Sequence, residues 1–184
     1  ALVTASGMAA ISAALLSNLR AGDHALVQST VYGGTATFLT RDGPRMGIEV
    51  DFVDASSPED WAAALRPQTR VFYVESVANP LLSVGRLREV VAFAKAHGLV
   101  TIIDNTFPSP VNFQPAKIGF DLVVHSATKY LNGHSDIVAG VIAGSPERVA
   151  AARHLLNHLG GSAGGRRARY ARSDGRRRQG AHGG

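Results

Sequence analysis

Apolar residues recur at helical spacing in several stretches of this chain. The clearest stretch runs from Gly85 to His97, where the apolar residues form one face and Gly98 stands where a helix would end. Ser6 precedes another such stretch and fits the N-cap of a first helix. The pattern predicts helices over residues 7–20, 34–43, 58–66 and 85–97, the second of them weaker, and a last helix that ends near residue 159.

Short apolar runs separate these helical stretches. They predict strands over residues 24–28, 48–53, 70–74, 99–103 and 122–124, and a further strand before the last helix. Short apolar strands that alternate with helices are typical of a mostly parallel sheet with helices on both faces. The chain is therefore expected to adopt an α/β fold.

Polar residues stand directly after several of the predicted strands. They are Tyr32, Glu75, Asn79, Asp104 and Lys129. In a parallel sheet the carboxyl ends of the strands meet at one edge, and ligands bind outside that edge. The sequence thus predicts a single site that contains these five side chains.

The segment Ser126-Ala127-Thr128-Lys129 carries the strongest candidate chemistry. An apolar strand end would partly desolvate Lys129, which favours a neutral amine that can form a Schiff base. Ser126 and Thr128 are suited to donate hydrogen bonds to a phosphate group. Taken alone, these four residues favour a solvated loop lysine with two capping hydroxyls.

Composition narrows the class of protein. The 45% hydrophobic content is ordinary for a globular domain, and the apolar runs are too short to cross a membrane. The chain has no cysteine, so we expect a cytoplasmic location and neither disulfides nor thiolate metal sites. No pair among His97, His125 and His134 has metal-ligand spacing, so no metal is expected.

Residues 160–184 differ from the rest in composition. They are rich in Gly and Arg and almost lack aliphatic residues, so we expect a domain over residues 1–159 followed by a disordered tail. Seven arginines and one aspartate give the tail a charge of +6, which leaves −1 of the net +5 for residues 1–165. An arginine-rich tail can bind nucleic acid or a protein partner. We favour instead a reading frame shifted after Ser162, and do not expect nucleic acid as a partner.

Five motifs carry a resemblance to a known family. They are SGMAA around Gly7, VYGGT around Tyr32, ESVANP around Glu75 and Asn79, DNTF around Asp104, and SATKYLNGHSD around Lys129. In this order and spacing they resemble the transsulfuration, or Cys/Met metabolism, family of pyridoxal-phosphate (PLP) enzymes, over residues 1–161. The resemblance implies the large domain of the type I PLP-dependent transferase fold, with a seven-stranded sheet.

The resemblance also implies roles for individual residues. Lys129 matches the lysine that forms the internal aldimine and then shuttles protons, and Asp104 matches the acid that pairs with the pyridine nitrogen. Tyr32 matches the aromatic residue that stacks on the cofactor ring and takes part in proton transfer. Asn79 matches a residue near the phenolic oxygen of the cofactor and the carboxylate of the substrate, and Glu75 is expected to help to position the substrate.

The phosphate group of the cofactor has its own set of matching residues. Gly7 and Met8 match backbone N–H donors, and a helix that starts there would add the positive end of its dipole. Ser126 and Thr128 match side-chain donors on the other flank. Taken alone, most Ser-Gly helix starts are only caps.

The implied activity is that of a PLP-dependent carbon–sulfur lyase or transferase. It would act on cystathionine, homocysteine, methionine or O-acyl-homoserine by γ-elimination or γ-replacement, and NGHSD resembles the cystathionine γ-lyase and γ-synthase branch. An aminotransferase of the same fold is an alternative. A nicotinamide-binding domain is disfavoured because no G-x-G-x-x-G follows a strand.

The chain departs from the family pattern in length. Family members are about twice as long and have an N-terminal arm and a C-terminal small domain, which supply further cofactor and substrate contacts. The resemblance implies a homo-oligomer, a tetramer built from dimers, for full-length relatives. We expect this chain to be a truncated form with weak cofactor binding and little activity alone.

Overall fold

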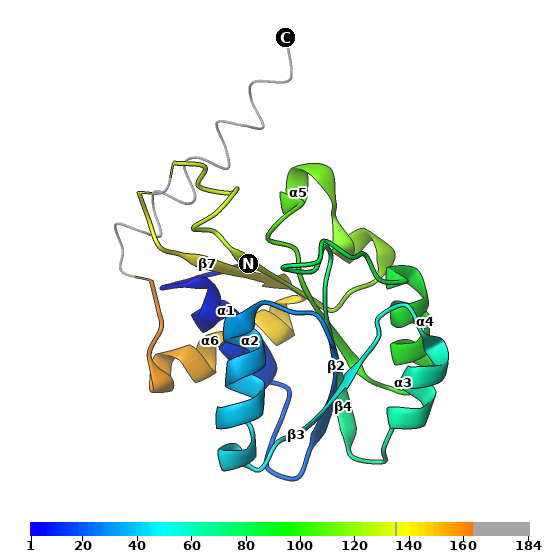
Figure 1. Cartoon of the computed structure of the whole chain (residues 1–184). Coiled ribbons are helices and arrows are strands. Elements are labelled where there is room, and N and C mark those ends of the chain that lie inside the picture. The colour runs from blue at the N-terminus through cyan, green and yellow to red at the C-terminus, as the bar shows by residue number, and fades with distance from the viewer. Residues whose placement is uncertain (135, 164–184) are drawn as a thin grey trace.

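A computed structural model of the chain describes residues 1–134 and 136–163 (Figure 1). Seven strands form one sheet in the order β1-β7-β6-β5-β4-β2-β3. The sheet separates two layers of helices, which confirms the predicted α/β class. The strands are β1 (Leu2–Thr4), β2 (His24–Gln28), β3 (Glu49–Val53), β4 (Thr69–Glu75), β5 (Val100–Asp104), β6 (Leu122–Ser126) and β7 (Gly140–Gly144).

The sheet is mostly parallel, as predicted. The pairs β2 with β3, β2 with β4, β4 with β5, and β5 with β6 are all parallel. β7 is antiparallel to both of its neighbours, β1 and β6. The carboxyl ends of β2, β4, β5 and β6 therefore lie at one edge.

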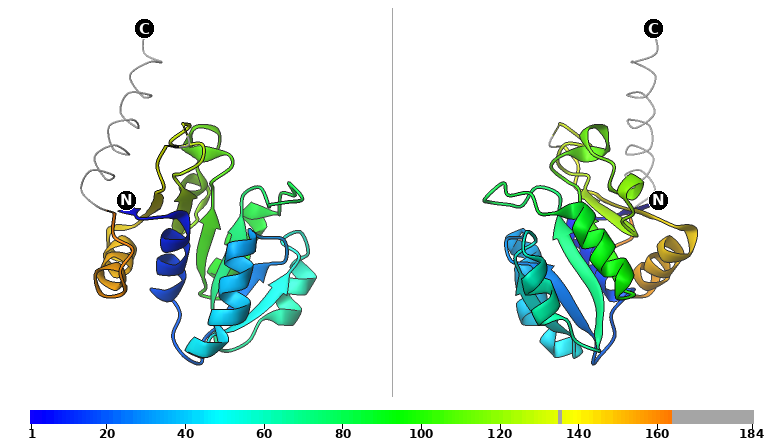
Figure 2. Two further views of the ribbon diagram at one scale, coloured as in Figure 1. Left: turned by 60° about the vertical axis from the view of Figure 1, so that its left-hand side comes forward. Right: turned by 90° about the vertical axis from the view of Figure 1, so that its right-hand side faces the viewer.

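Helices cover both faces of the sheet (Figure 2). On one face α1 (Gly7–Leu16), α2 (Gly33–Thr37) and α6 (Pro146–Leu159) pack over a core that includes Leu15, Tyr73 and Ile102. On the other face α3 (Pro58–Ala64) and α4 (Leu87–Ala96) pack over a core around Trp61 and Phe72. The remaining helical elements are η1 (Phe38–Asp42), η2 (Pro44–Met46), α5 (Ser109–Asn112) and η3 (Pro115–Ile118).

Helix starts follow the capping residues that the sequence offers. The side chain of Ser6 accepts the N–H of Ala9 at 3.1 Å and starts α1, and Ser57 caps α3, where Pro58 occupies the first turn. Gly98 follows α4 with a left-handed φ of 66°. A residue with a side chain would rarely adopt this backbone conformation, so glycine suits the end of the helix. None of the described helices is long and apolar enough to cross a membrane.

Several elements differ from the predicted ones, among them the short helical elements α5 and η3, which the sequence pattern does not predict. The first helix ends at Leu16, short of the predicted residue 20, and the second is divided into α2, a π-helical turn and a 3-10 turn. Strand β1 was not predicted, because three residues carry no periodicity and the strand is defined by its pairing with β7. Residues 164–184 of the predicted tail lie outside the described residues, whereas Gly161 accepts the N–H of Ala5 at 2.7 Å and Ser162 pairs with Thr4.

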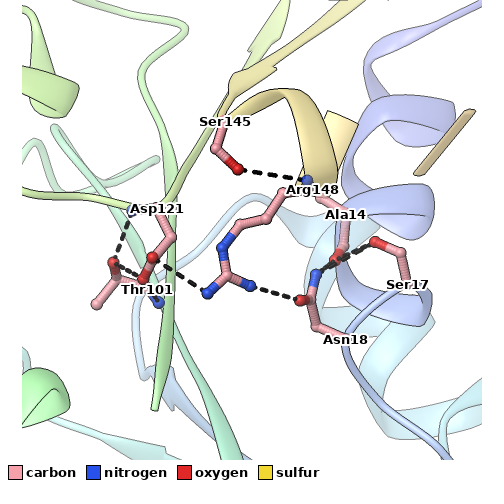
Figure 3. A network of polar contacts seen from close by, with 7 residues as sticks. All are labelled: Ala14, Ser17, Asn18, Thr101, Asp121, Ser145 and Arg148. Atoms are coloured by element: carbon pink, nitrogen blue, oxygen red, sulfur yellow. Dashed lines mark hydrogen bonds and ion pairs between the residues drawn. The ribbon is translucent and has the colours of Figure 1, made fainter. Parts of the chain in front are cut away.

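A polar network ties the helices to the amino-terminal edge of the sheet (Figure 3). Arg148 of α6 contacts Asp121 at 3.2 Å and donates to Asn18 beyond α1 at 3.1 Å. Asp121 in turn accepts the N–H and the hydroxyl of Thr101, both at 2.9 Å. This network lies opposite the edge at which the candidate site residues gather.

Candidate active site

A pocket of about 530 Å³ opens at the carboxyl edge of the sheet. It lies between the start of α1 and the segments that follow β2, β4, β5 and β6. All nine site residues predicted from the sequence line it: Gly7, Met8, Tyr32, Glu75, Asn79, Asp104, Ser126, Thr128 and Lys129. In particular, Lys129 and Asp104 face the same pocket, as a group bound to both would require.

One wall of the pocket is the N-terminus of α1. A Cβ on Gly7 would lie 2.8 Å from the Cβ of Ser126, so only glycine allows the helix start to approach the end of β6 this closely. The first turn of α1 contains no acidic residue. Free N–H groups and the helix dipole therefore favour an anion at this wall.

Thr128 and Lys129 lie in the turn that follows β6. The hydroxyl of Thr128 donates to the carbonyl of Ala139 at 3.2 Å and accepts its N–H at 3.1 Å, so its proton is already engaged. The side chain of Lys129 is exposed, and the partial desolvation predicted for its amine from the sequence is wrong for the chain alone. The prediction failed because the turn carries Lys129 beyond the apolar strand end.

Asp104 is a buried acid at the end of β5, with 9% of its surface exposed. Its Oδ1 accepts the N–H of Thr106 at 2.8 Å and also the Thr106 hydroxyl. Burial raises the pKa of the carboxyl, and the bonds from Thr106 oppose that shift. No ion pair within residues 1–134 and 136–163 includes Asp104, so a cationic group placed in the pocket would supply the missing charge.

Tyr32 presents a half-exposed ring at the pocket. A Cβ on Gly34 would collide with this ring and lie 3.1 Å from the sulfur of Met8. The glycine of the VYGGT motif thus makes room for the aromatic ring beside the start of α1. This placement is compatible with the predicted stacking role of Tyr32, which stays a prediction.

Glu75 lies at the end of β4 with only 4% of its surface exposed. Its two oxygens accept backbone N–H groups, Oε1 from Tyr32 at 2.7 Å and Oε2 from Asn79 at 3.1 Å. Burial raises the pKa of Glu75 to about 7, and the charge of Asp104 adds to the shift, whereas the two N–H groups lower it. The side chain thus contacts the loops that carry two other site residues.

Several pocket residues were missed by the sequence reasoning. Thr106 and Phe107 belong to the DNTF motif and Tyr130 to the SATKY motif, but no role was assigned to them. The rings of Phe107 and Tyr130 lie 5.9 Å apart at their centroids. The motif itself was the available signal, since residues next to a site residue often share its pocket. The others that line the pocket are Ser6, Ile11, Val77 and Val138.

The described residues contain no cluster of three His, Asp or Glu side chains that could hold a metal ion. What they do contain is an amine, a buried carboxylate and an aromatic ring around one pocket, next to a helix start that favours an anion. Fold and pocket together fit an α/β domain that binds an anionic cofactor, as the sequence predicts.

The chain belongs to the family described as Cys/Met metabolism PLP-dependent enzymes, whose family model matches residues 1–171. A probable cystathionine γ-synthase from Herpetosiphon aurantiacus is 41% identical over 162 residues, which cover 88% of this chain and 50% of the relative. A cystathionine β-lyase from Lactococcus lactis subsp. cremoris is 44% identical over 156 residues, which cover 84% of this chain and 41% of the relative.

A solved structure agrees with the sequence comparisons. The crystal structure of cystathionine γ-lyase from Lactobacillus plantarum complexed with L-serine is 34% identical, with a TM-score of 0.89. The match covers 94% of this chain and 45% of that chain. This chain thus spans half or less of the length of each of these relatives.

Proposed function

We propose that this chain is the cofactor-binding part of a PLP-dependent carbon–sulfur lyase or transferase that acts on small sulfur-containing amino acids. The observation that carries the proposal is the shared pocket of Lys129 and Asp104, an amine and a buried acid without an ionic partner among the described residues. The family membership and the names of the relatives support it.

The residues of the pocket fit the chemical groups of PLP. The N-terminus of α1 and the hydroxyl of Ser126 offer hydrogen-bond donors to a phosphate. Gly7 has no side chain, so none stands between the helix start and Ser126. Asp104 offers a carboxylate to a protonated ring nitrogen, and Tyr32 offers an aromatic face. Lys129 offers the amine that would hold the cofactor aldehyde. Thr128 fits less directly, because its proton is engaged with Ala139.

Each of these residues has a proposed task in the reaction. Bound PLP supplies an electron sink for negative charge that develops at the Cα atom of an amino acid. Asp104 keeps the sink effective, because a nearby carboxylate favours the protonated form of a ring nitrogen. The amine of Lys129 would hold the cofactor, and when free it would accept the Cα proton and return it at a neighbouring carbon. Asn79 and Tyr32 orient the substrate and the ring.

The reaction itself is proposed only at the level of its class. The named relatives include a γ-synthase, a β-lyase and a γ-lyase, which differ in whether a bond to sulfur is formed or broken and at which carbon. A homo-oligomeric assembly and low activity of this chain alone stay predictions.

Cofactor attachment tests the proposal directly. The chain has three lysines, Lys95, Lys117 and Lys129. After incubation with PLP and reduction with borohydride, peptide mapping is expected to place the cofactor mass on the peptide with Lys129. Lys129→Ala should abolish the visible absorbance of the complex, whereas Lys95→Ala, a change on the exposed side of α4, should not. Cofactor on Lys95 or Lys117 in place of Lys129 would refute the assignment.

Product analysis tests the reaction class. With cystathionine or methionine, release of a keto acid with ammonia and a thiol is expected. Transfer of the amino group to an added keto acid would instead support an aminotransferase. A long incubation at high protein concentration is needed, since we expect slow turnover.

A further inference from the structure

Glu75 connects two loops that approach the pocket from different strands. Tyr32 follows β2 and Asn79 follows β4, and their backbone N–H groups point at opposite oxygens of the same carboxylate, at 2.7 and 3.1 Å. Each oxygen thus has one main-chain donor. A single side chain fixes where both loops begin.

The backbone at Glu75 and Ser76 is bonded to the ends of the neighbouring strands. The N–H of Glu75 donates to the buried side chain of Gln28 at 3.0 Å, which links the ends of β4 and β2. The next residue, Ser76, donates its N–H and its hydroxyl to the carbonyl of Asp104 at 2.9 and 3.1 Å, which links β4 to β5. Glu75 therefore transmits the position of three strand ends to the two loops.

The loops in question carry side chains that line the pocket. Tyr32 directly precedes α2, and its side chain makes no cap. The bond from its N–H to Glu75 therefore joins the start of α2 to the end of β4. Asn79 lies in a loop whose neighbouring residues Leu81 and Leu82 are 72% and 63% exposed. Backbone bonds from Ala78 to Ser83 at 2.9 Å and from Leu82 to Ala78 at 2.7 Å close the loop on itself. The bond from the N–H of Asn79 to Glu75 then joins this closed loop to the end of β4.

We propose that Glu75 is a positioning residue, a clamp that holds the Tyr32 and Asn79 loops in the arrangement that receives the cofactor. Its effect on the cofactor rests on the proposed function, whereas the clamp itself is a property of the chain without ligand. The sequence predicts that Glu75 helps to position the substrate, whereas the proposed clamp positions two loops of the pocket.

The clamp requires an ionised carboxylate. A carboxylate accepts hydrogen bonds at both oxygens, whereas a protonated carboxyl group or an amide has one atom that carries hydrogen and cannot accept well. One of the two N–H groups then loses its acceptor in a buried place. The titratable groups that face Glu75 are Asp104 on β5 and Tyr73 on β4.

The variant Glu75→Gln tests the clamp, with Glu89→Gln on the exposed side of α4 as the matched control. Amide hydrogen exchange of the chain without cofactor is the primary measurement. We expect exchange at Tyr32 or Asn79 to accelerate about tenfold or more in Glu75→Gln, with no change at Leu15 of the core. The dissociation constant for PLP should rise about tenfold, since a charged hydrogen bond is lost. Unchanged exchange at both amides in the folded variant would overturn the proposal.

The unsubstituted chain provides a second test in case the variant does not fold. The amide signals of Tyr32 and Asn79 should titrate together, with one shared midpoint near the pKa of about 7 of Glu75. The amide of Thr106 reports Asp104 separately, because it donates to that carboxylate. The clamp is refuted if either amide signal does not change with pH, or if both change with the midpoint of the Thr106 amide.

The two proposals can fail separately. A wild-type chain that does not bind PLP but shows the shared titration would contradict the proposed function and support the clamp. A chain that binds PLP at Lys129, but whose Tyr32 and Asn79 amides do not titrate with Glu75, would support the proposed function and contradict the clamp.

Discussion

Thr106 holds one oxygen of Asp104 with two hydrogen bonds, one from its backbone N–H at 2.8 Å and one from its hydroxyl. The same hydroxyl accepts the N–H of Ser126 at 2.7 Å. Oδ1 is thus occupied, and a cation in the pocket is left with Oδ2. Thr106 thereby links the proposed partner of the ring nitrogen to a proposed ligand of the phosphate.

Loss of the Thr106 hydroxyl should weaken both ends of this link. Thr106→Val keeps the shape but leaves the N–H of Ser126 without its acceptor, and we expect a loss of about 1–3 kcal/mol in unfolding free energy. Thr106→Ser, which retains the hydroxyl, is the control and should stay near wild type. Urea unfolding and PLP titration measure the two effects. Equal PLP affinity in the valine and serine variants would argue against the link.

The close approach at the start of α1 predicts a sharp difference between two glycines. Gly7→Ala would force the new Cβ to 2.8 Å from the Cβ of Ser126, and overpacking of this kind costs about 1–3 kcal/mol. Gly33→Ala, at the start of α2, meets no atom within 4 Å. We expect PLP affinity to fall about tenfold or more in the first variant and to persist in the second. Tight binding by Gly7→Ala would mean that this wall does not hold the phosphate.

The pH dependence of stability should include opposing contributions from Glu75 and His125. Burial raises the pKa of Glu75 from 4.5 to about 7, so the folded chain binds more protons than the unfolded chain in that window and stability falls as pH rises through it. Burial lowers the pKa of His125 from 6.5 to about 4, so stability rises with pH between about 4 and 6.5. Each effect is on the order of 1–3 kcal/mol, and the two act in opposite directions over overlapping pH ranges.

The variant Glu75→Gln should uncover the contribution of His125. We expect its unfolding free energy to rise between pH 4 and 6.5 more steeply than that of wild type, as measured by urea unfolding at several pH values. His125→Asn should show the reverse, a decline with pH that Glu75 causes. Parallel pH profiles for Glu75→Gln and wild type would contradict the raised pKa of Glu75.

The network at the opposite edge should affect stability without affecting the pocket. Arg148→Met removes the contacts to Asp121 and Asn18 but keeps the apolar stem (Figure 3). Both members of the ion pair are about one-third exposed, so we expect a loss of only about 1 kcal/mol. Arg153→Met, an exposed change on the same helix, is the control. Circular dichroism during urea unfolding measures the loss, and PLP affinity should not change.

Much of the fold could be predicted because continuous apolar runs mark its strands and a clear apolar face marks α4. The rule that the carboxyl ends of parallel strands meet at one edge also predicts, from the sequence, that Tyr32, Asp104 and Lys129 share one site. Strand β1 could not be predicted, because it is defined by its pairing with β7, which lies far along the chain. The division of the predicted helix at residues 34–43 escaped because the pattern does not report a change from α to π geometry.

The parts of the site that could not be predicted depend on where individual atoms lie. The role of Thr106 arises from bonds to Asp104 and to Ser126, which is 20 residues away. Likewise, a sequence pattern indicates that Glu75 follows a strand but not that both its oxygens face main-chain donors. The exposure of Lys129 depends on the path of a turn, which strand periodicity does not fix.

The antiparallel pairing of β1 with β7 has a consequence for synthesis of the protein. β1 leads directly into the helix start at Ser6 and Gly7, and Gly140 of β7 packs so closely against Ser6 that no side chain fits between them. The anion-facing end of α1 thus gains its final support only from residues made more than a hundred positions later. A nascent chain on the ribosome would therefore remain unable to capture PLP until β7 has emerged.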